Sequence, residues 1–478
     1  MESKFGNTEN YRILIRDKKG AYLLHPFTSK TEKKFTIEQC SSIIPTKKYF
    51  AILNMGKLSV YLTSDCSLFK EFEDLNQVCA VNFSQNDKYL TIIQKPVVEK
   101  NLKIFDLSNN CALIQEFRSQ THPNNEWPQI KFSHDEEYIY FHNKLTLEIY
   151  DKNKNCINKI ENILGFEDIQ LEDKHLLVAS TFVLRGGKGK QDYNIVTYDF
   201  KDLSKPVKTF NTSLTDRVKI KVSLDQKYIL INTINDNTSN KSYYGQSSIY
   251  FLEISTGRFT KFNLPEGPIH DFSWCPNDEH FIICAGHLPS TVKYYKKNGT
   301  FEKDIAKGNF NTVKISPDSR IVALCGFGSL KGDIEFYSLK DFSLIGKNLF
   351  FCCVTFEWSQ DSKYLIGGVL STRVKVDNEY RIMKYNGEEV MVDKNIGEIY
   401  DVLFLHELDG NKIGYDEFTI EKNAKSLEEK KKENKGGFKI TSTLGAIDFS
   451  NKNKNEPVDE GGVVGLGKKK KKKKKKDQ

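Results

Sequence analysis

A short phrase recurs along this chain, and it constrains the fold more than any other feature of the sequence. A β run ends at a Ser or Cys, a turn rich in Asp and Asn follows, and five residues later an aromatic or apolar residue resumes the next β run. Each copy is typical of strand, tight turn, strand. The six clear copies are Phe83–Tyr89, Phe132–Tyr138, Val222–Tyr228, Trp274–His280, Ile315–Ile321 and Trp358–Tyr364.

The spacing of the phrase predicts the kind of fold. Successive anchors lie 49, 90, 52, 41 and 43 residues apart, counted along Ser84, Ser133, Ser223, Cys275, Ser316 and Ser359. A four-stranded propeller blade takes about 40 to 45 residues, so the gap of 90 corresponds to two blades. Degenerate copies at Ile44–Phe50 and Ile169–Val178, and the start of another at Val402, bring the marks to nine. We therefore expect an all-β chain with a single WD40-like β-propeller of nine blades.

The ends of a propeller must be joined, because a lone blade leaves an apolar face and an open edge. Tyr11–Arg16 and Ala21–Leu24 flank a turn-rich tetrapeptide and predict a hairpin that completes the last blade. We expect the propeller over residues 1–418, a short charged helix over 419–435 and a largely disordered basic tail over 436–478. Two β-sandwich domains are the alternative, but sandwiches lack a constant phrase at blade length.

The net charge of +8 is concentrated near the C-terminus. From Lys425 onward 17 lysines stand against 8 acidic residues, which leaves 54 basic and 55 acidic residues for 1–424. Such a lysine run repels itself, stays extended, and attracts RNA phosphate without reading sequence. A tail that only improves solubility and a nuclear import signal are the alternatives. The tail ends in nine consecutive lysines, Lys468, Lys469, Lys470, Lys471, Lys472, Lys473, Lys474, Lys475 and Lys476.

Several function classes find no support in the sequence. No apolar run approaches the ~18 residues that a membrane helix needs. The ten cysteines lack CxxC spacing and the nine histidines lack HExxH, so we expect reduced thiols in a cytoplasmic protein, with no metal or cofactor. The nucleophile motif GxSxG is absent, and the Asp residues of the phrase serve turns. We expect no catalytic residue.

Two glycine-rich segments and three tryptophans are the remaining candidates for contact. Gly326–Gly332 lacks the GxxxxGK[ST] order of a phosphate loop and stands between β runs, so glycines with positive φ in a turn are expected. Arg185, Lys188 and Lys190 could meet RNA phosphate, or could belong to a solvent loop. Trp127 is a candidate exposed contact on a blade connection or packs on its own loop. The other two, Trp274 and Trp358, are expected in the core.

The block Cys325–Tyr337 (CGFGSLKGDIEFY) resembles the eukaryotic translation initiation factor 2A family. Further blocks resemble it in the same order, and the likeness is densest from Ser242 to Tyr385. The blocks are Ser242–Gln246, Gly267–Trp274 and Leu370–Asn378 with Tyr380–Ile382. The resemblance implies a nine-bladed, non-catalytic factor similar to proteins that place initiator methionyl-tRNA without hydrolysing GTP. It assigns structural roles to the family-motif residues Gly326, Phe327, Gly328 and Gly332.

The partners implied by the resemblance are the small ribosomal subunit, through rRNA and ribosomal proteins, with initiator tRNA and mRNA as further candidates. No membrane contact is implied, and a monomer is expected. One alternative is a protein-only scaffold similar to the propeller subunit of initiation factor 3. Another is an enzyme active at the centre of the propeller, for which the sequence offers no convergent acid, base or metal set.

Overall fold

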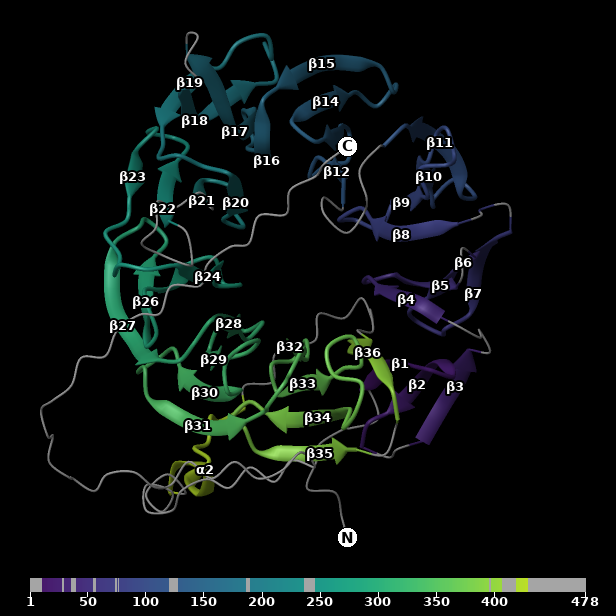
Figure 1. Cartoon of the computed structure of the whole chain (residues 1–478), viewed down its shortest axis with the longest axis vertical. Helices are drawn as coiled ribbons and strands as arrows, with labels where there is room; N and C mark the ends of the chain where they lie inside the picture. Colours follow the sequence, from purple (N-terminus) through teal and green to yellow (C-terminus); the bar gives the residue numbers. More distant parts are fainter. Residues whose placement is uncertain are drawn as a thin grey trace, which may run out of the picture. The chain divides into compact units, whose positions relative to one another are not determined.

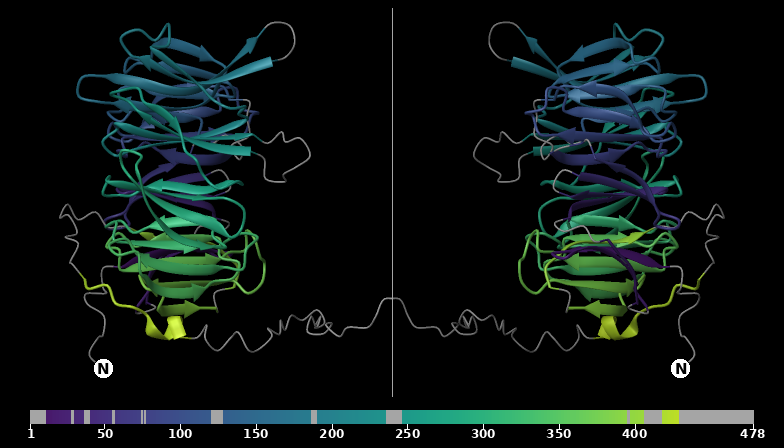
Figure 2. Two further views of the ribbon diagram at one scale, coloured as in Figure 1. Left: turned by 90° about the vertical axis from the view of Figure 1, so that its left-hand side faces the viewer. Right: turned by 90° about the vertical axis from the view of Figure 1, so that its right-hand side faces the viewer.

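The computed structural model describes residues 11–428 except 28–29, 36–39, 55–56, 74, 76, 120–127, 186–189, 236–245, 395–396 and 406–417. In this part of the chain 36 strands form nine four-stranded antiparallel sheets. The sheets follow one another around a ring (Figure 1), and side views show the strands stacked within it (Figure 2). The predicted nine-bladed, all-β propeller is confirmed. The described propeller belongs to one compact unit of the chain, which ends at Leu427.

Eight of these sheets are built from four consecutive strands, which run in order from the centre of the ring to its rim as strands A, B, C and D (Figure 1). The first four of these blades are: blade 1, β4 (Cys40–Pro45), β5 (Tyr49–Asn54), β6 (Lys57–Leu62), β7 (Leu68–Phe72); blade 2, β8 (Val78–Phe83), β9 (Tyr89–Gln94), β10 (Leu102–Asp106), β11 (Ala112–Phe117); blade 3, β12 (Ile130–Phe132), β13 (Ile139–Asn143), β14 (Thr146–Tyr150), β15 (Cys156–Glu161); blade 4, β16 (Ile163–Gln170), β17 (His175–Arg185), β18 (Lys190–Asp199), β19 (Lys208–Asn211).

The second half of the ring repeats this plan. Its blades are: blade 5, β20 (Arg217–Val222), β21 (Tyr228–Asn235), β22 (Gln246–Glu253), β23 (Phe259–Lys261); blade 6, β24 (Ile269–Trp274), β25 (His280–Ala285), β26 (Ser290–Lys296), β27 (Phe301–Gly308); blade 7, β28 (Thr312–Ile315), β29 (Ile321–Cys325), β30 (Asp333–Ser338), β31 (Leu344–Leu349); blade 8, β32 (Thr355–Trp358), β33 (Tyr364–Val369), β34 (Glu379–Lys384), β35 (Glu389–Asp393).

The ninth blade joins the two ends of the propeller. Its inner strand is β36 (Ile399–Leu405), and its other strands are β1 (Arg12–Asp17), β2 (Gly20–His25) and β3 (Lys30–Phe35). β1 pairs antiparallel with β36, from Arg12 opposite Leu405 to Asp17 opposite Ile399. The Arg12 guanidinium is buried and donates to the Thr63 carbonyl of blade 1 (3.0 Å), so the closing blade is bonded to its neighbour.

The recurring phrase forms the A–B turn of a blade. In all six clear copies the anchor N–H donates to the carbonyl five residues later, at 2.8 to 3.1 Å. Where the anchor is Ser, its Oγ also accepts the N–H of that fifth residue, at 2.9 to 3.0 Å. The third residue after the anchor has φ between 59° and 65°. This left-handed residue reverses the chain within the turn.

That third residue also links each turn to the preceding blade. Its side chain accepts backbone N–H groups from the turn before it: Lys48 donates to Asp87 (3.0 Å), Asn86 to Glu136 (3.0 Å), Gln170 to Gln226, Leu224 and Asp225 to Asp278 (2.6 and 3.1 Å), Asn277 to Ser319 (2.8 Å) and Asp318 to Ser362 (3.0 Å). The phrase therefore specifies both the turn and the contact between adjacent blades.

Blade 4, whose copy of the phrase is degenerate, uses a different contact. The Asp168 carboxylate of β16 accepts hydrogen bonds from the Tyr140 hydroxyl and the His134 N–H (3.3 Å), both in blade 3. It also contacts the His175 Nε2. The His175 ring stacks on Phe200 with centroids 3.7 Å apart. A partly buried carboxylate with several partners replaces the missing phrase at the junction of blades 3 and 4.

The apolar core lies between blades. One cluster combines Ile282 and Cys284 of blade 6 with Val322 and Leu324 of blade 7, all fully buried. Trp358 is 8 % exposed, and its indole N–H donates to the Lys314 carbonyl of the preceding blade (3.0 Å). Trp274, at the end of β24, is partly buried against the cluster shared by blades 5 and 6, and its indole N–H donates likewise to the Lys221 carbonyl (2.9 Å). Trp358 therefore lies in the core as the sequence predicted, whereas Trp274 is only partly buried and packs at the edge of a core cluster.

The described residues from Phe418 onward are hydrogen-bonded to blades 7 and 8. Helix α2 (Ala424–Glu428) begins at Ala424 rather than at Thr419, because the preceding residues have no regular secondary structure and are hydrogen-bonded to blades 7 and 8. The Tyr385 hydroxyl donates to the Thr419 carbonyl (3.2 Å), and the Asn423 N–H donates to the Ile345 carbonyl (2.8 Å). The rest of the expected helix lies outside the described residues. No helix in the described part is long and apolar enough to cross a membrane.

Replacing Asp278 with Ala tests the contact between turns. We expect Asp278→Ala to lower the free energy of unfolding by about 1 to 3 kcal/mol, because two backbone N–H groups of blade 5 lose a charged acceptor. Asp278→Asn, which keeps an acceptor and tolerates the left-handed backbone, is the matched control and should cost less. Urea unfolding measures both. Equal stability of Asp278→Ala and the wild type would show that these bonds do not stabilise the ring.

Candidate functional site

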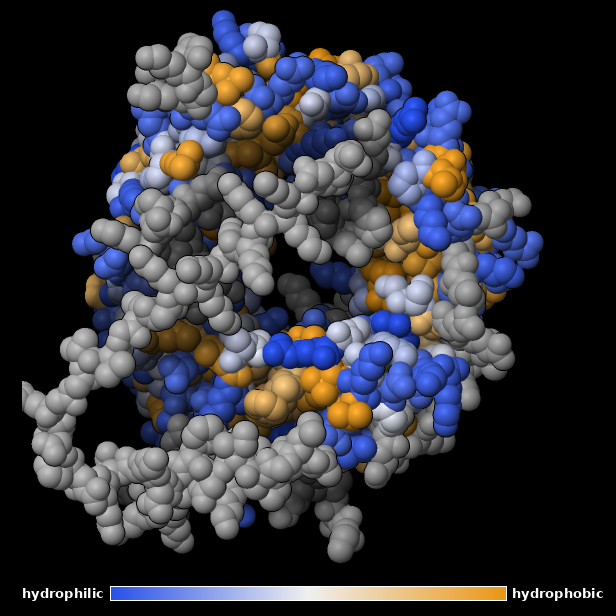
Figure 3. Space-filling model, in the orientation of Figure 1, coloured by the Kyte–Doolittle hydropathy of each residue, from blue (hydrophilic) through white to orange (hydrophobic). Residues whose placement is uncertain are grey.

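The two faces of the propeller are built from different connections. Because successive strands run in opposite directions, A–B and C–D loops lie on one face, and B–C loops and D–A connections lie on the other. We call these the AB/CD face and the BC/DA face. Figures 1 and 3 look onto the BC/DA face. The A–B turns with their interblade hydrogen bonds belong to the AB/CD face.

The BC/DA face is the more basic one. Its described loop residues include ten Lys and Arg and six Asp and Glu. The described residues of the AB/CD loops include 14 Lys and Arg and 16 Asp and Glu. The nearly neutral propeller thus divides its charge unevenly. The ten cations are Lys18, Lys19, Lys95, Lys100, Arg118, Lys144, Lys331, Arg373, Lys375 and Lys394, and the six acids are Glu73, Glu99, Asp216, Glu266, Asp377 and Glu398.

Exposed apolar side chains favour the same face. Among the described residues 17 large hydrophobic side chains are well exposed, of which seven lie in BC/DA loops and two in AB/CD loops. Figure 3 shows hydrophobic side chains around the inner strands of blades 7 and 8, beside the hollow at the centre. The seven are Val97, Leu145, Leu214, Leu288, Phe351, Val354 and Val376.

Three BC/DA loops of blades 7 and 8 meet and form one surface. They are residues 326–332, 350–354 and 370–378, and we call them together the three-loop surface. The Phe350 N–H donates to the Gly332 carbonyl (2.9 Å), and the Arg373 guanidinium donates to the Gly328 carbonyl. Two of these loops carry blocks on which the family resemblance rests, so the fold brings those blocks together.

The family-motif glycines have three different reasons to be glycine. Gly328 (φ 73°) and Gly332 (φ 95°) are left-handed, as the sequence predicted. Gly326 is not, but a Cβ there would overlap the Asn309 carbonyl oxygen. A Cβ at Gly332 would overlap the Phe350 carbonyl oxygen as well. Phe327 anchors the loop by packing edge-on against Phe356, with ring centroids 5.4 Å apart.

The structure does not bring the other predicted site residues into one described site. Lys468–Lys476, Trp127 and Lys188 lie outside the described residues. Arg185 ends β17 and pairs with Lys190 of β18, and the ends of these strands point to the BC/DA face. Sequence reasoning missed Phe351 and Val376 as exposed residues, although Val376 stands in the family block Leu370–Asn378.

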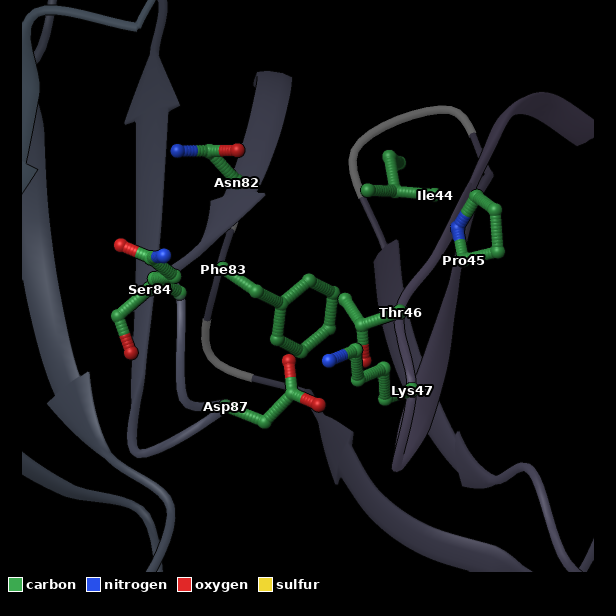
Figure 4. Close-up of a pocket in the computed structure, with 9 residues that line it drawn as sticks. Ile44, Pro45, Thr46, Lys47, Asn82, Phe83, Ser84 and Asp87 are labelled. Carbon is green, nitrogen blue, oxygen red and sulfur yellow. The ribbon is translucent and has the colours of Figure 1, made fainter. Parts of the chain in front are cut away.

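A groove of about 320 Å³ opens between the A–B turns of blades 1 and 2. Figure 4 shows the Asp87 carboxylate pointing across it toward Thr46 and Lys47. That carboxylate already accepts the Lys48 N–H, so the groove is the junction between two blades rather than a site with a free acid. Within the described ranges no group of three or more His, Cys, Asp and Glu residues could hold a metal.

All ten cysteines are free thiols, and seven of them are buried. Burial raises the pKa of Cys275 and of Cys353 to about 12 each, because a thiolate would lose its hydration. Cys156 is exposed. The buried thiols act as small apolar side chains of the blade interfaces.

Comparison with known proteins gives consistent matches. Residues 208–402 match the family model "Eukaryotic translation initiation factor eIF2A". Proteins named eukaryotic translation initiation factor 2A from Dictyostelium discoideum and Schizosaccharomyces pombe are 30% and 26% identical, each over 73% of this chain. The chain covers 58% and 63% of these relatives. A crystal structure titled as the eukaryotic initiation factor shares the fold with a TM-score of 0.72, at 21% identity over 84% of this chain and 99% of that one.

Alanine at two glycines of the three-loop surface separates backbone strain from overlap. Gly328→Ala would meet only the Asn311 side chain, at an ordinary contact distance of 4.0 Å, and should cost about 1 to 2 kcal/mol of unfolding free energy through its left-handed backbone. Gly332→Ala adds overlap with a carbonyl and should cost about 1 to 3 kcal/mol more. Chemical denaturation measures both variants. Equal losses would show that the loop relaxes freely around Gly332.

Thiol labelling tests the burial of the cysteines. At pH 8 iodoacetamide should modify Cys156 in the native protein and leave Cys275 and Cys353 unmodified, because only a thiolate reacts and their raised pKa keeps them protonated. Mass spectrometry of tryptic peptides reads the result, with labelling in urea as the control. Native labelling of Cys353 as fast as Cys156 would contradict the packing of blades 7 and 8.

Proposed function

Because residues 208–402 belong to the eukaryotic translation initiation factor 2A family, as the sequence resemblance predicted, we propose that this chain is a translation initiation factor. It binds the small (40S) ribosomal subunit and assists delivery of initiator methionyl-tRNA and start-codon selection without hydrolysing GTP. The matched segment begins in β19 and ends in β36. It therefore spans blades 5 to 8 and the inner strand of the closing blade.

The observation that carries the proposal is the basic BC/DA face. Cations on exposed loops of a rigid ring attract phosphate groups of folded RNA, and backbone contacts of this kind fix position without reading bases. On the AB/CD face acids outnumber cations, and Lys297, for example, is paired with both Asp225 and Asp278. We therefore assign the contact with ribosomal RNA to the BC/DA face.

The tail and two loops extend this contact. The lysines 468–476 supply a dense positive charge that adds affinity without specificity. The segment with Arg185, Lys188 and Lys190 joins strand ends on the BC/DA face, as does the connection with Trp127 between β11 and β12. These four residues are proposed contacts to RNA or to ribosomal proteins on the same side of the ring.

The role is one of binding. Carboxylates of the recurring phrase, such as those of Asp87 and Asp278, accept hydrogen bonds from N–H groups of neighbouring turns. Carboxylates held in this way support the ring and do not form an acid and base pair. The chain is proposed to act as a cytoplasmic monomer whose partners are the small subunit, with initiator tRNA and mRNA beside it.

Charge reversal on each face tests which side meets the ribosome. Replacing Lys18, Lys19 and Lys95 by Glu should weaken co-sedimentation with purified small subunits by about tenfold or more, because phosphate contacts become repulsive. The matched control reverses three exposed lysines of the AB/CD face, Lys152, Lys154 and Lys201, and should change binding less than about twofold. A larger loss of binding in the Lys152, Lys154 and Lys201 variant would assign the ribosome contact to the AB/CD face.

The same assay separates the tail from the propeller. Deleting 436–478 should lower affinity and flatten the dependence of log K on log salt by about 0.7 to 0.9 for each phosphate that the tail neutralises in the full chain. An unchanged slope would remove the tail from the proposal and leave the propeller contact. Absence of binding by the full chain at low salt would overturn the proposed function.

A further inference from the structure

We infer that the three-loop surface of blades 7 and 8 docks a segment of a partner protein that presents apolar side chains together with carboxylates. This goes beyond the RNA contact proposed for the face as a whole. It concerns a different class of partner and stands on the exposed apolar residues of one small area.

Exposure of apolar side chains in this area is high. Phe351 is 65 % exposed and Val376 66 %, on two loops that pack against the same apolar core between blades 7 and 8. Val354 is 45 % exposed in the same loop as Phe351. An apolar side chain in water lacks the favourable free energy of burial, and a cluster of such exposed side chains marks an interaction site.

The loops hold these side chains in place. Phe350, next to Phe351, is fully buried beneath the Arg381 guanidinium, 4.4 Å above its ring. The Val354 N–H donates to the Gly368 carbonyl (2.8 Å). Asn378 is 3 % exposed, and its side-chain amide donates to the Val374 carbonyl (2.6 Å), which closes the loop that carries Val376. A surface already ordered in this way loses little entropy when a partner binds.

Charge around these residues selects the partner. The three loops contain the cations Lys331, Arg373 and Lys375 and one acid, Asp377. Apolar anchors bordered by cations are complementary to a segment that combines large apolar residues with Asp or Glu. Two of the three exposed anchors are valines, which offer no ring for base stacking, so the surface suits protein better than single-stranded RNA.

Peptide selection on the full chain tests the inference. A phage library of random twelve-residue peptides is selected on the wild-type protein and counter-selected on Phe351→Ser/Val376→Ser. Both positions are exposed, so this variant should keep the wild-type circular dichroism and thermal midpoint. We expect enriched peptides to combine Asp or Glu with Leu, Ile, Phe or Trp.

Fluorescence anisotropy with a synthetic enriched peptide then compares the peptide affinities of the wild type and the variants. Phe351→Ser/Val376→Ser should weaken binding at least tenfold and Lys375→Glu at least threefold, since one removes anchors and the other the complementary charge. Val97→Ser, at a more exposed position (80 %) on the same face in blade 2, is the matched control and should change binding less than twofold.

Three results would overturn the inference. These are recovery of no peptide that distinguishes the wild type from Phe351→Ser/Val376→Ser, enrichment of basic peptides, and retention of full affinity by Lys375→Glu. A labelled oligouridine RNA is measured in parallel. If the Phe351→Ser/Val376→Ser variant weakens RNA binding as much as peptide binding, the three-loop surface belongs to RNA. The small-subunit assay is independent of all these outcomes.

Discussion

Pairing of β1 with β36 closes the ring, and the rest of the structure depends on it. Each apolar cluster in the propeller is shared by neighbouring blades, so an open ring would expose the faces of its first and last blades to water. The Arg16 guanidinium extends the closure, because it donates to Asp401 of β36 (2.6 Å) and to the Cys40 carbonyl of blade 1 (3.0 Å). Backbone pairing and this arginine together join segments from opposite ends of the propeller.

Within the closed ring the two faces have different roles. The A–B turns of the AB/CD face are committed to structure, since their acceptor side chains bond the preceding turn, as Glu136 bonds Asn86. The BC/DA loop residues that the structure describes carry no such repeated contact, so their side chains differ from blade to blade and can serve binding. This division explains why net positive charge and most exposed apolar loop residues lie on the face that the phrase does not occupy.

Much of the fold could be predicted from the sequence because its signals are local. A turn needs particular residues at fixed offsets, and alternating apolar residues follow, so the phrase identified the blades and the buried position of Trp358. Glycine conformations at Gly328 and Gly332 followed from the same local chemistry. The bonds between turns were missed, although the recurring acceptors Asp87, Glu136 and Asp278 three residues after each anchor were visible signals.

The sequence by itself determined the blade period, the turns, the family resemblance and the concentration of charge in the tail, because each is written in neighbouring residues. Only the tertiary structure decided which loops share a face. Strand direction alternates within each sheet, so residues about forty positions apart along the chain, such as Lys331 and Arg373, come to lie on one surface, while charges in one blade separate to opposite sides. The three-loop surface arises from that separation and from ring closure.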